Sequence, residues 1–134
     1  MSFIAVADTH TILWYLYGDP RLSAIAKSFI QTAVRNGSKV AVSSISLVEI
    51  GYLVEKGRIL STAFEDVTST LTDPSQTFEE APVSRWVADS LRQVSRLSVP
   101  DMPDRIIAAT GLHFAVPVIS RDSKIRAANI QTIW

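Results

Sequence analysis

Short apolar runs that alternate with helical segments are the feature of this sequence that most restricts its fold. Four such runs are predicted to be strands, at residues 4–7, 40–43, 116–120 and 132–134, and residues 77–80 are predicted to be a further strand at a sheet edge. Helical spacing fills the intervals, at residues 9–17, 23–35, 46–56, 63–71, 104–114 and 122–128, and a further amphipathic stripe covers 83–97. Because buried parallel strands are apolar throughout and need helical crossovers, the alternation predicts an α/β sandwich with a central, mostly parallel sheet and helices on both faces.

Length and composition set further limits. The chain has 134 residues and no repeat, low-complexity tract or linker, so residues 1–134 are predicted to form a single domain. There are no cysteines, which excludes disulfides and thiolate metal sites and favours a cytoplasmic location. No apolar run approaches the ~18 residues of a membrane span, so no membrane partner is expected.

The charge balance argues against one class of function. Thirteen basic and 13 acidic residues give a formal net charge of zero, whereas a passive nucleic-acid binder usually carries a net positive charge. An enzyme acting on nucleic acid remains compatible with this balance, because an acidic pocket that holds a divalent cation can lie beside a basic rim.

Four acidic residues occupy equivalent places relative to the predicted strands. Asp8 follows the first strand, and Glu49 falls in the first turn of the helix after the second strand. Asp122 follows the strand that ends at Ser120, and Asp104 begins the helix before that strand. Ligands of such sheets bind beyond the carboxyl ends of the strands, so all four acids are expected at one rim.

Each acid also has a purely structural explanation. The sequence from Ser46 to Glu49 matches a capping box, which would turn the Glu49 carboxylate back toward the backbone. Asp104 would interact with the positive end of its helix dipole. Helix N-caps are the alternative for three acids: Asp8, Asp101 and Asp122.

Taken together, the four acids favour a catalytic or metal-binding role over a purely structural one. Carboxylates that converge within ~4–6 Å raise one another's pKa, and a fold tolerates them when a cation neutralises them or some stay protonated. Oxygen ligands without sulfur select Mg²⁺ or Mn²⁺, which activate water for phosphoryl chemistry. The predicted catalytic and metal-binding residues are Asp8, Glu49, Asp104 and Asp122.

Four blocks of the sequence carry a family resemblance. They are Asp8-Thr9-His10 with Leu13-Trp14, then SSISLVEI at 43–50, DMPDRIIAAT at 101–110 and PVISRD at 117–122. In this order and at these separations they resemble the PIN-domain family, in particular the VapC-type toxin ribonucleases of toxin–antitoxin pairs. The subgroup often has Asp-Pro-Phe-Asp in the third block, where this chain has Asp101-Met102-Pro103-Asp104 with the same spacing of acids.

The resemblance has specific implications for fold and function. It implies a PIN-like three-layer sandwich, a Mg²⁺- or Mn²⁺-dependent endoribonuclease acting on RNA, a cognate antitoxin that obstructs the site, and a homodimer. Asp8, Glu49 and Asp104 correspond to the core metal-binding acids, and Asp122 to a fourth that often acts through water. Asp101 matches an acid common in the subgroup and is either a helix cap or a ligand.

Several other residues could have either a functional or a purely structural role. Thr9 and Ser120 are placed to orient the acids by hydrogen bonds. Four cations contact phosphates or are merely solvated: Arg105, Arg121, Lys124 and Arg126. His10 either touches the site or belongs to a helix turn, and Trp14 and Trp86 either stack on bases or, as their apolar helix faces favour, pack in the core.

The segment 46–71 is also open to two interpretations. With Tyr52, Leu53 and Ile59 exposed, it would offer a groove to a partner helix, where the antitoxin is expected, or to a second copy. The alternative is ordinary core packing.

Rival functions fit less well. A phosphatase of the haloacid-dehalogenase type needs a second aspartate two residues after the first, where this chain has His10. A receiver domain needs paired acids after the first strand, and Asp8 has no acidic neighbour. The alternative that remains is a catalytically inactive PIN-like RNA- or protein-binding module.

Overall fold

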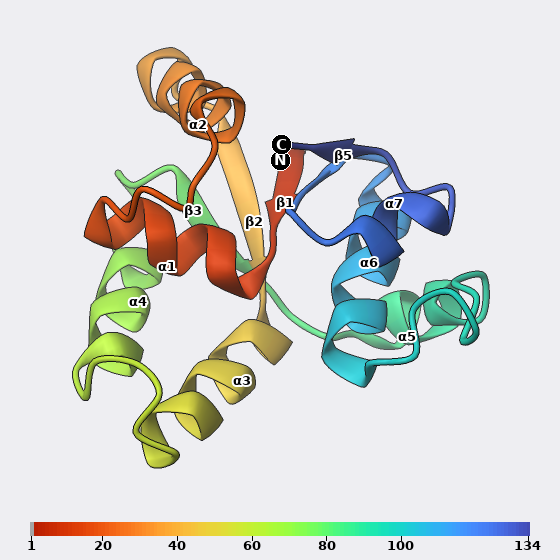
Figure 1. The fold of residues 1–134 in the computed structure, drawn as a ribbon. Helices are drawn as coiled ribbons and strands as arrows, with labels where there is room; N and C mark the ends of the chain where they lie inside the picture. The colour runs from red at the N-terminus through yellow and green to blue at the C-terminus, as the bar shows by residue number, and fades with distance from the viewer. Residues whose placement is uncertain (1) are drawn as a thin grey trace.

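The computed structural model describes residues 2–134, and Met1 lies outside them. A sheet of five parallel strands, in the order β3-β2-β1-β4-β5, forms the centre of the molecule (Figure 1). Its strands are β1 (Phe3–Ala7), β2 (Lys39–Ser43), β3 (Phe78–Ala81), β4 (Val118–Ile119) and β5 (Thr132–Ile133). The predicted α/β fold is confirmed, and the run predicted at the sheet edge is the edge strand β3.

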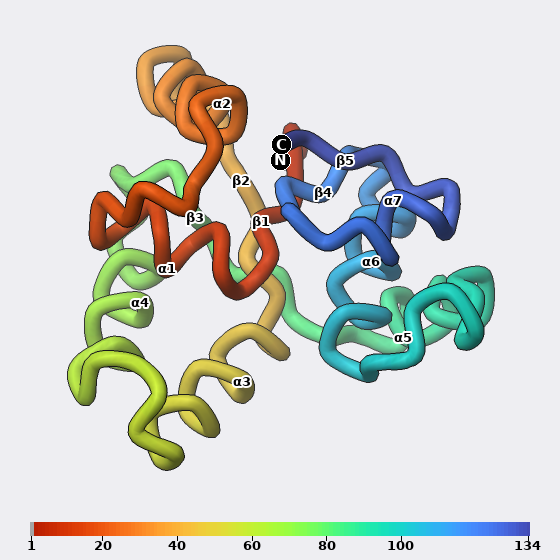
Figure 2. The backbone as a smooth tube through the Cα atoms, viewed as in Figure 1, coloured from red at the N-terminus to blue at the C-terminus, as the bar shows by residue number. Residues whose placement is uncertain are grey.

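Helices cover both faces of this sheet. One side carries α1 (Thr9–Tyr17), α2 (Ala24–Asn36), α3 (Ser44–Glu55) and α4 (Ala63–Thr72). The other carries α5 (Arg85–Leu91), α6 (Met102–Phe114) and α7 (Ser123–Ala127). Figure 2 shows the two groups on either side of the strands, with α3 below their carboxyl ends.

Two hydrophobic cores result from the pleat of the strands, because successive side chains point to opposite faces. In β1, Ala5 and Ala7 pack into the core under α1 to α4, whereas Val6 packs into the core under α5 to α7. In β2, Val40 and Val42 belong to the first core and Ala41 to the second. The central strands are therefore buried on both faces, which explains their continuous apolar sequences.

The predicted helical stripe over residues 83–97 is wrong in its second half. Helix α5 ends at Leu91, and Leu97 is 92% exposed. The reason lies on another helix: Arg105 Nη2 donates to the carbonyl oxygens of Leu91 at 3.1 Å and Val94 at 3.0 Å. These bonds hold a non-helical turn. They give Arg105 internal partners, whereas the sequence had offered it either a phosphate contact or a solvated position. Trp86, which was predicted to pack in the core, is 57% exposed.

Helix α6 approaches β4 through a glycine, and this contact yields a first testable prediction. A Cβ atom on Gly111 would lie 2.9 Å from Val118 Cγ2 and 3.1 Å from the Val116 carbonyl oxygen. Gly111→Ala is therefore expected to reduce the free energy of unfolding by about 1–3 kcal/mol, the usual cost of overpacking. Chemical denaturation monitored by circular dichroism measures the change.

The matched control is Gly51→Ala in α3. The nearest atom to a Cβ there is Phe64 Cδ2, at 4.0 Å. Alanine favours helix over glycine, so this variant is expected to be as stable as the wild type or more stable by up to about 1 kcal/mol. Equal destabilisation by both substitutions would contradict the proposed close approach of α6 to β4.

Among residues 2–134, none of the helices combines the length and the apolar character needed to cross a membrane.

Candidate active site

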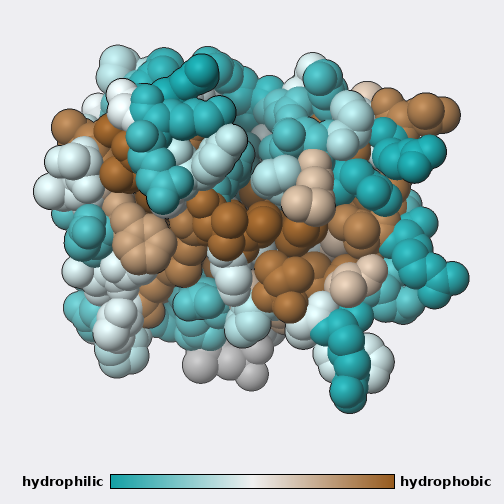
Figure 3. Space-filling view, turned by 90° about the horizontal axis from the view of Figure 1, so that it is seen from below, coloured by the Kyte–Doolittle hydropathy of each residue, from teal (hydrophilic) through white to brown (hydrophobic). Residues whose placement is uncertain are grey.

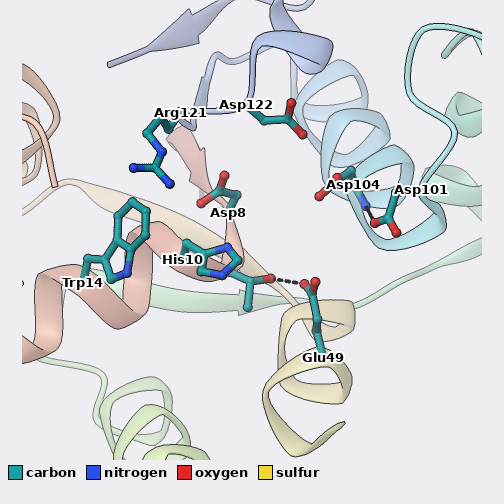
Figure 4. Close-up of a pocket in the computed structure, with 9 residues that line it drawn as sticks. Asp8, His10, Trp14, Glu49, Asp101, Asp104, Arg121 and Asp122 are labelled. Atoms are coloured by element: carbon teal, nitrogen blue, oxygen red, sulfur yellow. Dashed lines mark hydrogen bonds between the residues drawn. The ribbon is translucent and has the colours of Figure 1, made fainter. Parts of the chain in front are cut away.

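A cavity of about 420 Å³ opens beyond the carboxyl ends of β1 and β4, between α1, α3 and α6 (Figure 4). The four predicted site residues all line it: Asp8, Glu49, Asp104 and Asp122. Asp101 lines it as well. The structure thus brings together acids that are up to 114 positions apart, from Asp8 to Asp122, while their catalytic and metal-binding roles stay predictions.

Three of these acids are N-caps, as the structural explanation of each had proposed. Asp8 Oδ1 accepts from Thr11 N at 2.9 Å at the start of α1. Asp101 caps α6 with a bond of 3.3 Å, and Asp122 caps α7 with a bond of 2.8 Å. Each cap engages one carboxylate oxygen, so capping a helix and lining the cavity are compatible.

Glu49 departs from its predicted local role, because the capping box does not form. Helix α3 starts directly from β2, and Ser43 caps it by accepting from Ile45 N at 3.2 Å. This earlier start places Glu49 in the second turn, beyond reach of the capping position. Its side chain is held by Thr9 instead, whose Oγ1 donates to Glu49 Oε1 at 2.5 Å (Figure 4).

The hydroxyls predicted to orient the acids are both buried. Thr9 Oγ1 also lies 2.9 Å from Ser46 Oγ, so the link between α1 and α3 continues into the protein. Ser120 Oγ accepts from Asp122 N at 3.0 Å and fixes the backbone of that acid. Thr9 therefore orients a site carboxylate, that of Glu49, as predicted, whereas the bond of Ser120 is to the backbone of Asp122 and not to its carboxylate.

Asp104 has the strongest electrostatic perturbation in the cavity. Burial is the largest cause, and together with the neighbouring charges of Asp101, Asp122 and Glu49 it raises the pKa of Asp104 from an ordinary 3.8 to about 7. The protein alone therefore lacks the positive charge that would let this carboxyl ionise freely at neutral pH.

The chemistry of the donor set fits a hard divalent cation. The cavity offers carboxylate oxygens and the Thr9 hydroxyl, which Mg²⁺ and Mn²⁺ prefer. The acids stand around the cavity instead of at one point: within the described part of the chain, no three His, Asp or Glu side chains are placed closely enough to hold an ion.

One wall of the cavity combines a cation with aromatic rings. Arg121 lies over Trp14, with Cζ 4.8 Å from the ring centroid. His10 is exposed in the same wall, 5.4 Å from Trp14 between ring centroids. Of the two roles predicted for it, the structure therefore favours contact with the site. Trp14 is buried as predicted, yet it also faces the cavity, which its helical spacing alone did not reveal.

Comparison with known proteins places these features in context. The family described as PIN domain matches residues 5–130. No curated protein is similar enough in sequence to count as a relative.

Solved structures share the fold over nearly the whole chain. VapBC2 from Rickettsia felis, bound to a DNA fragment from its promoter, has a TM-score of 0.71 and 16% identity, covering 97% of both chains. A toxin–antitoxin complex from Klebsiella pneumoniae has a TM-score of 0.67 and 20% identity, covering 97% of this chain and 96% of that one. FitAcB from Neisseria gonorrhoeae has a TM-score of 0.61 and 18% identity, covering 96% and 95%.

Proposed function

The chain belongs to the PIN domain family, and from this premise we propose that it is a Mg²⁺- or Mn²⁺-dependent endoribonuclease that serves as the toxin of a toxin–antitoxin pair. The observation that carries the proposal is the cavity lined by five carboxylates, which come from α1, α3, α6 and α7 or their N-caps. Burial and mutual repulsion raise the pKa of Asp104 to about 7 there, which supports a site built to receive positive charge.

The chain's own residues would divide the work as follows. Asp8, Glu49 and Asp104 would hold the metal, and Asp122 would act through water. The bound ion would supply charge neutralisation and a water of lowered pKa for attack on the phosphodiester. Thr9 keeps Glu49 pointing into the cavity by its hydrogen bond, so the carboxylate does not need to reorganise during the reaction.

The antitoxin belongs to the proposal because the similar structure from Klebsiella pneumoniae is a toxin–antitoxin complex. A second cavity of about 430 Å³, partly lined by Leu13, Tyr17, Leu53 and Ile59, adjoins the acid cavity. Figure 3 shows hydrophobic residues gathered in a band across the face seen from below. We place the antitoxin in this apolar cavity, where it would also obstruct the acids, and expect the pair to act in the cytoplasm.

A second copy of the chain is the other proposed partner. Helix α3 exposes Val48 and Tyr52 to 65% and 57%, and Met102 at the start of α6 is 63% exposed. Apolar side chains in such numbers on one face favour a homodimer through α3 and α6.

The decisive experiment is a cleavage assay with a matched inactive variant. Purified protein is incubated with labelled single-stranded and structured RNAs in Mg²⁺, in Mn²⁺ and in a chelator. We expect cleavage only with metal. Asp8→Asn, purified identically to control for contaminating ribonucleases, should be at least about 100-fold slower. Asparagine caps helices as well as aspartate, so this variant should still fold.

Two results would contradict the proposal. Equal cleavage by wild type and Asp8→Asn would show that the acid cavity is not the source of the activity. RNA binding without cleavage in either metal would favour the inactive binding module.

A further inference from the structure

Trp14 stands in a wall shared by two cavities. Trp14 and His10 line both the acid cavity and the adjoining apolar cavity. Trp14 is only 6% exposed, and its indole packs against Trp134 with 5.9 Å between ring centroids. It is therefore a fixed surface, and it carries a guanidinium from each cavity: Arg121 at 4.8 Å and Arg21 at 4.9 Å from the ring centroid.

The two arginines differ in what their N–H groups contact. Arg21 pairs in a bidentate way with Asp19: its Nε donates to Oδ1 at 3.0 Å and its Nη2 donates to Oδ2 at 2.7 Å. Arg121 makes no hydrogen bond or salt bridge within residues 2–134, although the cavity it lines holds five carboxylates. Stacking uses the face of a guanidinium, so the N–H edge of Arg121 stays free for an anion.

The backbone around Arg121 is held in place on both sides. Ser120 N donates to the Ile133 carbonyl oxygen at 3.2 Å, and Asp122 N donates to Ser120 Oγ at 3.0 Å. A fixed backbone and a fixed indole together restrict the guanidinium, so little conformational entropy would be lost when it binds. Figure 4 shows Arg121 and Trp14 on one side of the cavity and Asp101 and Asp104 on the other.

An RNA strand that reaches the acids must pass a strongly negative rim. Among the described residues that line this cavity, Arg121 is the one cation facing five acids. It does not neutralise those acids by direct pairing, and it lies apart from Asp104. Because Arg121 lies across the cavity from Asp101 and Asp104, a phosphate next to the one being cut is an anion that it could contact.

We propose that Arg121, stacked on Trp14, binds the phosphate that flanks the scissile phosphodiester and thereby positions the RNA strand across the His10–Trp14 wall. The inference rests on the proposed ribonuclease function and adds to it a subsite for a neighbouring phosphate. It implies that the two parallel N–H groups of the Arg121 guanidinium are needed for full affinity, because bidentate contact with a phosphate requires both.

The test compares Arg121→Ala, Arg121→Lys and Arg21→Ala. For cleavage of an RNA oligonucleotide in Mg²⁺, Arg121→Ala should lower kcat/KM about 10- to 100-fold, the value of a charged hydrogen-bonded contact, mainly through KM. Arg121→Lys should recover part of the loss. Arg21→Ala removes the matching contact with the same indole but no free fork, so it should stay within about twofold of the wild type.

Binding provides a readout that a structural role would not move. In an Asp104→Asn background, which prevents cleavage, the affinity for labelled single-stranded RNA is measured over a range of salt concentrations. Loss of one phosphate contact should reduce the slope of log K against log salt by about 0.7 in the Arg121→Ala variant and leave it unchanged in Arg21→Ala. Melting temperatures confirm that each variant is folded.

Each outcome has a definite meaning. Equal losses for Arg121→Ala and Arg21→Ala, or an unchanged salt slope, would overturn the phosphate subsite while leaving the ribonuclease proposal intact. A wild type that binds RNA but never cleaves it would refute the ribonuclease and with it a subsite beside a scissile bond, even if a slope lowered by Arg121→Ala showed that this arginine contacts a phosphate. A wild type that neither cleaves nor binds RNA would overturn both.

Discussion

Replacing Asp104 by asparagine is expected to stabilise the metal-free protein above pH 7 while abolishing RNA cleavage. Burial, then Asp101, Asp122 and Glu49, raise the pKa of this carboxyl to about 7, so ionising it in the folded protein is unfavourable. Asparagine removes that cost. The same substitution removes a proposed metal ligand, so cleavage should fall at least about 100-fold.

The pH dependence follows from the direction of the shift. The folded pKa of Asp104 lies above the ordinary 3.8, so folded protein holds a proton that unfolded protein releases between pH 3.8 and about 7. The free energy of unfolding of metal-free wild type should therefore decrease as pH rises through this window. Because the group is half-buried and screened by water, we expect about 1–2 kcal/mol, and Asp104→Asn should lose this dependence.

Denaturation at several pH values in a chelator measures the effect. The control is Glu55→Gln, which neutralises an exposed carboxylate of α3 outside the acid cavity. If the free energy of unfolding of Asp104→Asn depended on pH as that of the wild type does, the cavity would not raise the pKa of this carboxyl.

Mg²⁺ or Mn²⁺ is expected to raise the melting temperature of the wild-type protein. An ion that binds only the folded state adds about 2.7 kcal/mol when its concentration is about 100 times its dissociation constant. Asp8→Asn should lose most of this gain, although asparagine can still accept the capping bond from Thr11 N. Differential scanning calorimetry with and without metal measures both shifts.

Asp101→Asn serves as the comparison and addresses the role left open for that residue. If Asp101 is only the cap of α6, the variant should keep the metal-induced rise in melting temperature. If Asp101 is a metal ligand, the variant should lose much of that rise. A wild type whose melting temperature ignores both metals, or an Asp8→Asn variant that responds as the wild type does, would count against a metal site in the cavity.

Much of the architecture was predictable because local signals agreed with the tertiary fold. Helix α1 has the predicted bounds, since Asp8 caps its start and Gly18 adopts a left-handed φ of 62° at its end. The apolar runs identified the strands because parallel strands covered on both faces carry no polar alternation. The convergence of Asp8, Glu49, Asp104 and Asp122 on one cavity followed from the rule that strand ends share an edge.

The sequence-based predictions failed where residues distant in the sequence, or a choice between two possible N-caps, determine the ends of helices. Ser43 and Ser46 are both good N-caps, and the end of β2 selects Ser43, which sequence spacing does not encode. Helix α5 ends at Leu91, where Arg105 from α6 binds the carbonyl oxygen of Leu91 and that of Val94 in the following turn. The position of Trp14 between two cavities likewise depends on the packing of α1 against its neighbours, so its apolar spacing indicated only burial.

The overlap between helix caps and cavity acids also bears on how this protein can change over generations. A single-base transition converts an aspartate codon into one for asparagine, and at Asp8, Asp101 and Asp122 the new amide could still anchor its helix. Lineages under pressure to silence the proposed nuclease would thus have a short genetic route to an inactive protein with an intact fold.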